Sequence, residues 1–108
     1  MKLTKRQIKK LKKLADDRLK WLRACIKGEK WAVEEYQDCR FCDEPIGCGD
    51  VCPAFGCCAY YISNSRDLLK TAFKFDDLTG ARKSRAKAHY KNLKPLIDRW
   101  RRKYIWEK

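Results

Sequence analysis

Apolar residues recur every three or four positions through the first part of the chain, which is the pattern of one face of an α-helix. Thr4 and Gln7 have the spacing of a capping box, Leu3 and Ile8 that of a hydrophobic staple, and Gly28 suits a helix C-cap. The pattern therefore predicts a long helix over about residues 4–28, whose other face is basic at nearly every position. The apolar positions of this helix are Ile8, Leu11, Ala15, Leu19, Leu22 and Ile26.

A second helical pattern begins near Ser63 or Ser65, either of which can act as an N-cap. We expect Gly80, with the aspartates before it, to end this helix. The side chains expected to be buried in it are Leu68, Leu69, Ala72 and Phe73.

A third pattern runs from about Ala81 to Trp106 and contains Pro95. Because proline removes a helical hydrogen bond and clashes with the preceding turn, we expect a kink there or two abutting helices. The apolar positions at helical spacing are Ala86, Tyr90, Leu93, Ile97, Trp100 and Tyr104.

Together these patterns predict one mainly α domain over residues 1–108, with a long N-terminal helix, an irregular cysteine-rich metal-binding loop and two or three C-terminal helices. The loop covers about residues 38–62 and the C-terminal helices about residues 64–107. Residues 29–38 fit either a short helix or an extended segment. The expected core joins the helices through Leu11, Leu19, Leu22, Leu69, Phe73, Leu93, Ile97 and Trp100.

The loop holds six of the seven cysteines within twenty residues. No continuous apolar signal region precedes it, and the longest apolar run, residues 57–62, is too short to span a bilayer. We therefore expect a reducing cytoplasm and no membrane, a setting in which clustered cysteines more often bind metal than form disulfides. The candidate ligands, of which four are expected to bind, are Cys39, Cys42, Cys48, Cys52, Cys57 and Cys58.

Structural zinc is the metal that this spacing favours, because zinc takes four thiolates in a tetrahedron. One selection of ligands is Cys39, Cys42, Cys48 and Cys52; the other keeps Cys39, Cys42 and Cys52 and adds Cys57 or Cys58. An iron-sulfur cluster is the weaker alternative, since only the Cys52-Pro53 pair is typical of it. Disulfides or uncombined thiols are the third. The seventh cysteine, Cys25, falls on the apolar side of the first helix, where we expect a core residue.

The order of these features resembles a group of small cysteine-rich phage and prophage proteins. Trp21 and Gly28 are followed by Cys39-x2-Cys42, by a cysteine pair that ends in Cys52-Pro53, and by a further cysteine before Tyr60. The resemblance covers about residues 21–61, although the second pair here has three intervening residues and Ala59 stands where those proteins have proline. It implies a mobile-element origin, a metal-held fold and location in the host cytoplasm, but no activity.

Charge is distributed very unevenly along the chain. Residues 1–30 carry 12 Lys/Arg against 3 Asp/Glu, and residues 82–108 carry 11 against 2, whereas residues 31–81 carry 4 against 9. Two basic arms thus flank an acidic middle in a chain of net charge +13. Basic segments of this density attract phosphate backbones, anionic membranes or acidic proteins.

Catalytic motifs are lacking, so the sequence predicts a binding protein rather than an enzyme. His89 is the only histidine, and we expect it to be a solvated residue at the edge of the last helix. No His-Glu-x-x-His or deaminase signature is present, and a site made only of cysteines leaves zinc no open position for chemistry. No small-molecule substrate is indicated.

The predicted binding surface lies on the last helix, where arginine and lysine surround Tyr90, Trp100, Tyr104 and Trp106. Such a mixture suits phosphate contact and base stacking, so we expect nucleic-acid binding without sequence-specific readout. The alternative is an inhibitor or adaptor that docks on an acidic host protein, for example a host-defence or nucleic-acid enzyme. The candidate contact residues are Arg82, Lys83, Arg85, Lys87, Lys91, Lys94, Arg99, Arg101, Arg102 and Lys103.

Overall fold

Helices account for nearly all of the residues that the computed structural model describes, which are 3–37, 52–53, 63–75 and 79–106. In chain order they are α1 (Lys5–Lys27), α2 (Lys30–Val33), α3 (Ser63–Phe75), α4 (Thr79–Arg101) and the π-helical turn η2 (Arg102–Trp106). The described ranges contain no strand. The predicted mainly α fold, with its long N-terminal helix, is confirmed.

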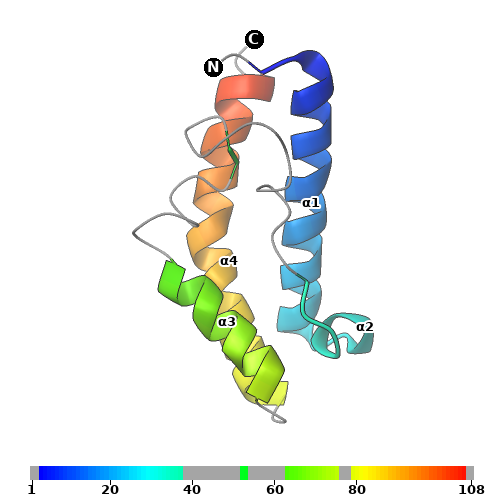
Figure 1. Cartoon of the computed structure of the whole chain (residues 1–108), viewed down its shortest axis with the longest axis vertical. Helices are drawn as coiled ribbons and strands as arrows, with labels where there is room; N and C mark the ends of the chain where they lie inside the picture. Colours follow the sequence, from blue (N-terminus) through cyan, green and yellow to red (C-terminus); the bar gives the residue numbers. More distant parts are fainter. Residues whose placement is uncertain (1–2, 38–51, 54–62, 76–78, 107–108) are drawn as a thin grey trace.

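The two long helices run antiparallel, side by side, and form the main body of the protein (Figure 1). The shorter α3 packs against the N-terminal half of α4, and α2 packs near the C-terminal end of α1. The molecule is elongated, with principal extents of 43 × 26 × 21 Å. A surface made from α1 and α4 therefore runs along most of its length.

Both predicted ends of α1 are confirmed. The Thr4 side chain accepts a hydrogen bond from the Gln7 amide at 3.2 Å, and the Gln7 side chain accepts one from the Thr4 amide at 2.9 Å. At the other end Gly28 has φ +79°, a left-handed conformation that favours glycine, and its amide donates to the Cys25 carbonyl at 3.1 Å. These caps hold α1 as one unit of 23 residues.

The predicted core is confirmed at every position, because all eight of its side chains are buried. Trp21, buried to 1% exposure, adds to it and meets Tyr36 and Phe73 at ring-centroid distances of 5.6 and 5.4 Å. Leu68 is an exception among the residues expected to be buried, with 44% exposure. Among the described helices α3 packs chiefly on α4, and a helix that packs on a single neighbour buries a narrower stripe than its apolar pattern suggests.

The ambiguous segment after α1 contains the four-residue helix α2 and then bends. Trp21 secures α2, because its indole nitrogen donates to the Ala32 carbonyl at 3.2 Å. Residue 38, the last of the segment, lies outside the described residues.

Helix α4 departs from the prediction in two ways. It begins at Thr79, so Gly80 lies inside its first turn and does not separate it from α3. It also continues through Pro95, so the alternative of two abutting helices is wrong. Proline leaves the Lys91 carbonyl without its helical donor, but Lys91 and Pro95 are both exposed, and water can replace that donor.

Candidate nucleic-acid interface

A row of basic side chains runs the length of α1 at steps of three and four residues. Residues at these steps lie on the same side of a helix. Asp16 is the one acidic member of the row, and the basic members are all exposed. They are Lys5, Lys9, Lys12, Lys20, Arg23 and Lys27.

A second row follows the same spacing along α4 and into η2. It also has one acidic member, Asp98. Lys94, four residues before Asp98, pairs with it at 2.6 Å and is half-buried. The other basic members are exposed: Lys83, Lys87, Lys91 and Arg102.

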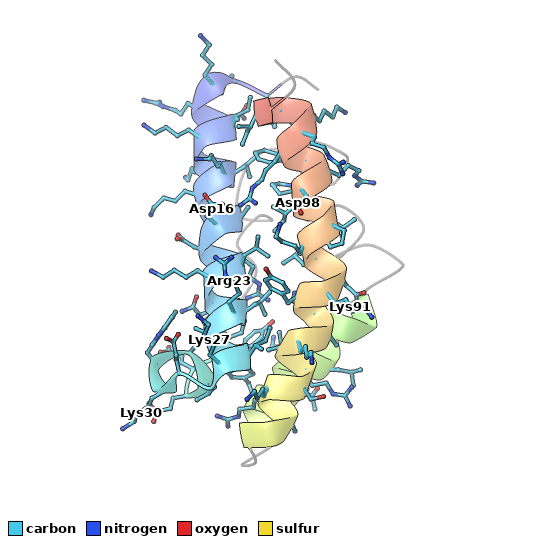
Figure 2. All side chains as sticks on the ribbon, turned by 180° about the vertical axis from the view of Figure 1, so that it is seen from behind. Asp16, Arg23, Lys27, Lys30, Lys91 and Asp98 are labelled. Carbon is cyan, nitrogen blue, oxygen red and sulfur yellow. The ribbon has the colours of Figure 1, made fainter. Side chains whose placement is uncertain are left out.

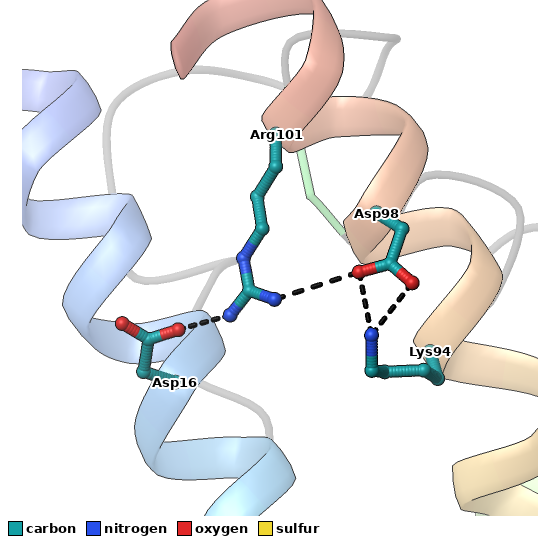
Figure 3. A network of polar contacts seen from close by, with 4 residues as sticks. All are labelled: Asp16, Lys94, Asp98 and Arg101. Carbon is teal, nitrogen blue, oxygen red and sulfur yellow. Dashed lines mark hydrogen bonds and ion pairs between the residues drawn. The ribbon is translucent and has the colours of Figure 1, made fainter. Parts of the chain in front are cut away.

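Arg101 joins the two rows through their acidic members (Figure 3). Its guanidinium forms an ion pair with Asp16 of α1, and it lies 3.5 Å from the Asp98 carboxylate on its own helix. The Arg101 side chain is only 15% exposed, whereas Asp16 is 47% exposed. The pairing fixes the C-terminal end of α4 against the middle of α1 and shows which flanks of the two helices face each other.

The rows therefore lie next to each other on one side of the molecule. Figure 2 views that side, with Asp16, Arg23 and Lys27 on α1 and Lys91 and Asp98 on α4. Within the described part of the chain, none of the exposed basic members forms an ion pair. We call this surface the α1/α4 basic face; it consists of Lys5, Lys9, Lys12, Lys20, Arg23, Lys27, Lys83, Lys87, Lys91 and Arg102.

The ten predicted contact residues fall into three groups in the structure. Arg82, Lys94 and Arg101 have partners within the protein; Arg82 donates to the Phe73 carbonyl at 3.2 Å and lies 5.2 Å over the Phe73 ring. Lys83, Lys87, Lys91 and Arg102 belong to the α1/α4 basic face. A separate, exposed row on α4 and η2 holds Arg85, Arg99 and Lys103, the last with its ammonium 5.4 Å over the Tyr104 ring.

The aromatic side chains predicted to lie among these Lys and Arg residues mostly pack inside the protein. Trp100 is 3% exposed, and Tyr90 and Tyr104 are half-buried against the core. The side chain of Trp106 lies outside the described set. These rings stabilise the packing of α4, and the part described offers them little freedom to stack on bases.

The prediction that His89 is a solvated surface residue is wrong, because it is 2% exposed. His89 lies three residues after Ala86 and four before Leu93, both of which are buried. That spacing places it on the core side of α4, not at its edge.

Among the candidate metal ligands the structure describes only Cys52, which is 9% exposed and packs with the core. The other five, Cys39, Cys42, Cys48, Cys57 and Cys58, lie outside the described residues. Within the described ranges no three His, Cys, Asp or Glu side chains come together as a metal site. Zinc coordination by four of the six cysteines remains a prediction.

Cys25 is a core residue, as expected, with no exposed surface. Its Sγ lies 3.5 Å from the Ala32 carbonyl oxygen, to which the thiol donates. Burial raises the pKa of the Cys25 thiol to about 12, against the opposing effect of the nearby Arg18 charge. The thiol therefore stays protonated at neutral pH.

The contribution of α1 to the basic face was not among the predicted contact residues. A signal for it exists in the sequence, since Lys5, Lys9, Lys12, Lys20, Arg23 and Lys27 share a single three-and-four spacing that passes through Asp16. The sequence does not show which side of α4 lies next to this row.

No family model, curated protein or solved structure matches the chain. The resemblance to small phage proteins is therefore still a hypothesis. In the ranges that the structure describes, no helix is both long enough and apolar enough to cross a membrane.

Proposed function

We propose that this protein binds nucleic acid through the α1/α4 basic face, without sequence-specific readout. The observation on which the proposal rests is that α1, α4 and η2 place ten exposed Lys and Arg side chains on one side of the molecule, none of which forms an ion pair with another described residue. Contacts from such side chains to phosphates supply most of non-specific nucleic-acid affinity, because they release condensed counterions.

The internal pairing supports this proposal. Asp16 and Asp98 neutralise Arg101 and Lys94, whose side chains are both partly buried. The Lys and Arg side chains of the α1/α4 basic face are exposed, and their mutual repulsion is unfavourable unless an anion is present. A polyanion neutralises all of them together.

In this proposal the cysteines have a structural role and hold zinc. Thiolates are the ligands that structural zinc prefers, and Cys52 is buried against the helices. A metal held by Cys52 and three other cysteines would attach the cysteine-rich segment to the core. The basic face would then act as the binding surface, with no catalytic step.

The test compares two quadruple variants that remove the same amount of charge. The face variant carries Lys20→Gln, Arg23→Gln, Lys87→Gln and Lys91→Gln, and the control carries Arg6→Gln, Lys70→Gln, Arg85→Gln and Arg99→Gln; all eight residues are exposed. Fluorescence anisotropy measures binding to a labelled mixed-sequence duplex at several salt concentrations. We expect the face variant to bind more weakly and its salt slope to fall by roughly 0.9 for each phosphate that it no longer neutralises.

Equally weakened binding by the two variants would overturn the proposed face, and absence of binding by the wild type would overturn the function. Affinities that differ strongly between unrelated duplex sequences would contradict non-specific readout. A pull-down from nuclease-treated lysate tests the rival hypothesis. One stoichiometric acidic protein, retained by the wild type but not by the face variant, would favour protein docking instead.

A further inference from the structure

Among the described residues, the α1/α4 basic face offers no exposed aromatic platform on which unpaired nucleobases could stack. Proteins that bind single strands combine a basic groove with exposed aromatic rings. Here Trp21 and Trp100 are buried, and Trp31, with 51% exposure, belongs to α2 beyond the end of the α1 row. Among the described side chains, those exposed on the face suit a nucleic acid whose bases stay paired and stacked.

The length of the face matches a turn of double-stranded DNA. From Lys5 to Lys27 the α1 row covers 22 helical steps, or about 33 Å at a rise of about 1.5 Å per residue. One turn of B-form DNA measures about 34–36 Å along its axis. If α1 lies along the duplex, the two ends of its row therefore meet the backbone about one turn apart.

The distribution of charge along the face agrees with this placement. Asp16 lies midway between Lys5 and Lys27, and its partner Arg101 connects it to Asp98. The middle of the α1 row is thus locally neutral, since its two carboxylates pair with Arg101 and Lys94, whereas both ends of the row carry only basic residues. Because a neutral segment gains little from contact with phosphates, the middle is suited to lie over a groove while the ends contact the backbone.

We infer that the α1/α4 basic face binds double-stranded DNA lengthwise, over about one helical turn, with the Asp16–Arg101–Asp98 bridge over a groove. This inference rests on the proposed nucleic-acid binding and adds the class of substrate and its orientation. Contacts with two separate segments of the DNA backbone make the affinity depend on duplex length. Contact through a single cluster of Lys and Arg side chains would not require this dependence.

Anisotropy titrations at one fixed salt concentration test it with four probes. The probes are a DNA duplex of about 20 base pairs, its single strand, the corresponding RNA duplex, and a DNA hairpin of about 6 base pairs, which is shorter than one turn. We expect the long DNA duplex to bind at least about tenfold more tightly than each of the other three.

The triple variant Lys5→Gln, Lys9→Gln, Lys12→Gln provides a sharper measurement, because it removes one end of the α1 row and leaves the other. It should bind the long duplex and the short hairpin with affinities equal within about threefold. The quadruple control variant with substitutions outside the face should keep the length dependence of the wild type.

Each alternative result contradicts a defined part of the inference. Single-stranded DNA bound as tightly as duplex would refute the duplex preference, and equal binding of the RNA duplex would refute the commitment to DNA. A length dependence retained in the triple variant would refute the lengthwise placement. These results leave the proposed function standing, whereas failure of all four probes to bind would overturn both.

Discussion

Arg18 is a buried charge whose surroundings are mainly aromatic. It is 6% exposed, its guanidinium carbon lies 4.8 Å from the centroid of the Trp21 ring and 5.8 Å from that of Tyr36, and Nη1 donates to the Gln37 carbonyl. Nε and Nη2 meet no acceptor within the described part of the chain. The stem and the face of the guanidinium thus contribute packing, while two buried donors oppose stability.

This balance predicts different outcomes for two substitutions of Arg18. Arg18→Met keeps most of the volume and removes the two buried donors, so its free energy of unfolding should stay within about 1 kcal/mol of the wild type. Arg18→Ala leaves a cavity beside Trp21 and Tyr36 and should lower it by about 3 kcal/mol. Urea unfolding measures both, and a methionine variant as unstable as the alanine variant would show that the charge itself is required.

Cys25 provides a prediction about reactivity and pH. Because burial raises its pKa to about 12, iodoacetamide at pH 8 should not modify Cys25 in the folded protein, but should modify it after unfolding. Since the folded pKa is the higher one, the contribution of Cys25 to stability is complete below the ordinary thiol pKa and is lost as pH rises toward 12. Peptide mass mapping locates the modification, and rapid labelling of native Cys25 would contradict its burial.

At the scale of elements, the contact between α1 and α4 combines apolar packing with the Asp16–Arg101 ion pair. A double-mutant cycle of Asp16→Asn and Arg101→Gln isolates the ion pair. We expect a coupling free energy of about 1 kcal/mol, because Asp16 is partly solvated although Arg101 is largely covered. Urea unfolding of the two single variants and the double variant measures this coupling. The control is a cycle of Lys13→Gln and Asp17→Asn, an exposed pair at 3.9 Å, for which we expect a coupling free energy near zero. Equal coupling in the two cycles would mean that the bridge adds nothing specific.

Local signals explain why much of the element order could be predicted from the sequence. The Thr4–Gln7 capping box and the Gly28 C-cap involve residues close together in the chain, so their spacing alone identifies them. Helix α4 shows the limit of such signals. The stability of a helix through Pro95 depends on its packing against α1 and α3, and Gly80 is tolerated in its first turn. The effect at Pro95 depends on the tertiary structure, which local signals do not contain.

The candidate site was predictable in its chemistry but not in its composition. The charges of Lys87 and Lys91 predict a binding surface. In the sequence Arg101 is equivalent to Arg102, whereas in the structure it pairs with Asp16. The two residues of that pair are 85 positions apart in the chain. Their contact depends on which flank of α4 faces α1, and periodicity does not determine that.

At the scale of the whole molecule, the cysteines are predicted to determine whether the helices stay together. Cys42→Ser should unfold the domain or loosen it severely, because structural zinc supplies much of the folding free energy of small domains. Cys25→Ala, which leaves the proposed ligands intact, is the control and should cost no more than about 1–2 kcal/mol. Native mass spectrometry should find one zinc per wild-type chain. A Cys42→Ser variant with unchanged thermal stability, or a metal-free wild type, would contradict the zinc staple.

The start of α1 has a consequence for how the protein responds to salt. Its first turn contains Lys5 and Arg6 and no acidic residue, although the positive end of the helix macrodipole disfavours cations there. The Thr4 cap thus stabilises a first turn that the charges of Lys5 and Arg6 destabilise. Added salt screens the unfavourable interaction of these charges with the macrodipole, and its cations also compete with the protein for phosphate groups. Rising ionic strength should therefore make the folded chain harder to unfold while weakening the proposed binding to DNA.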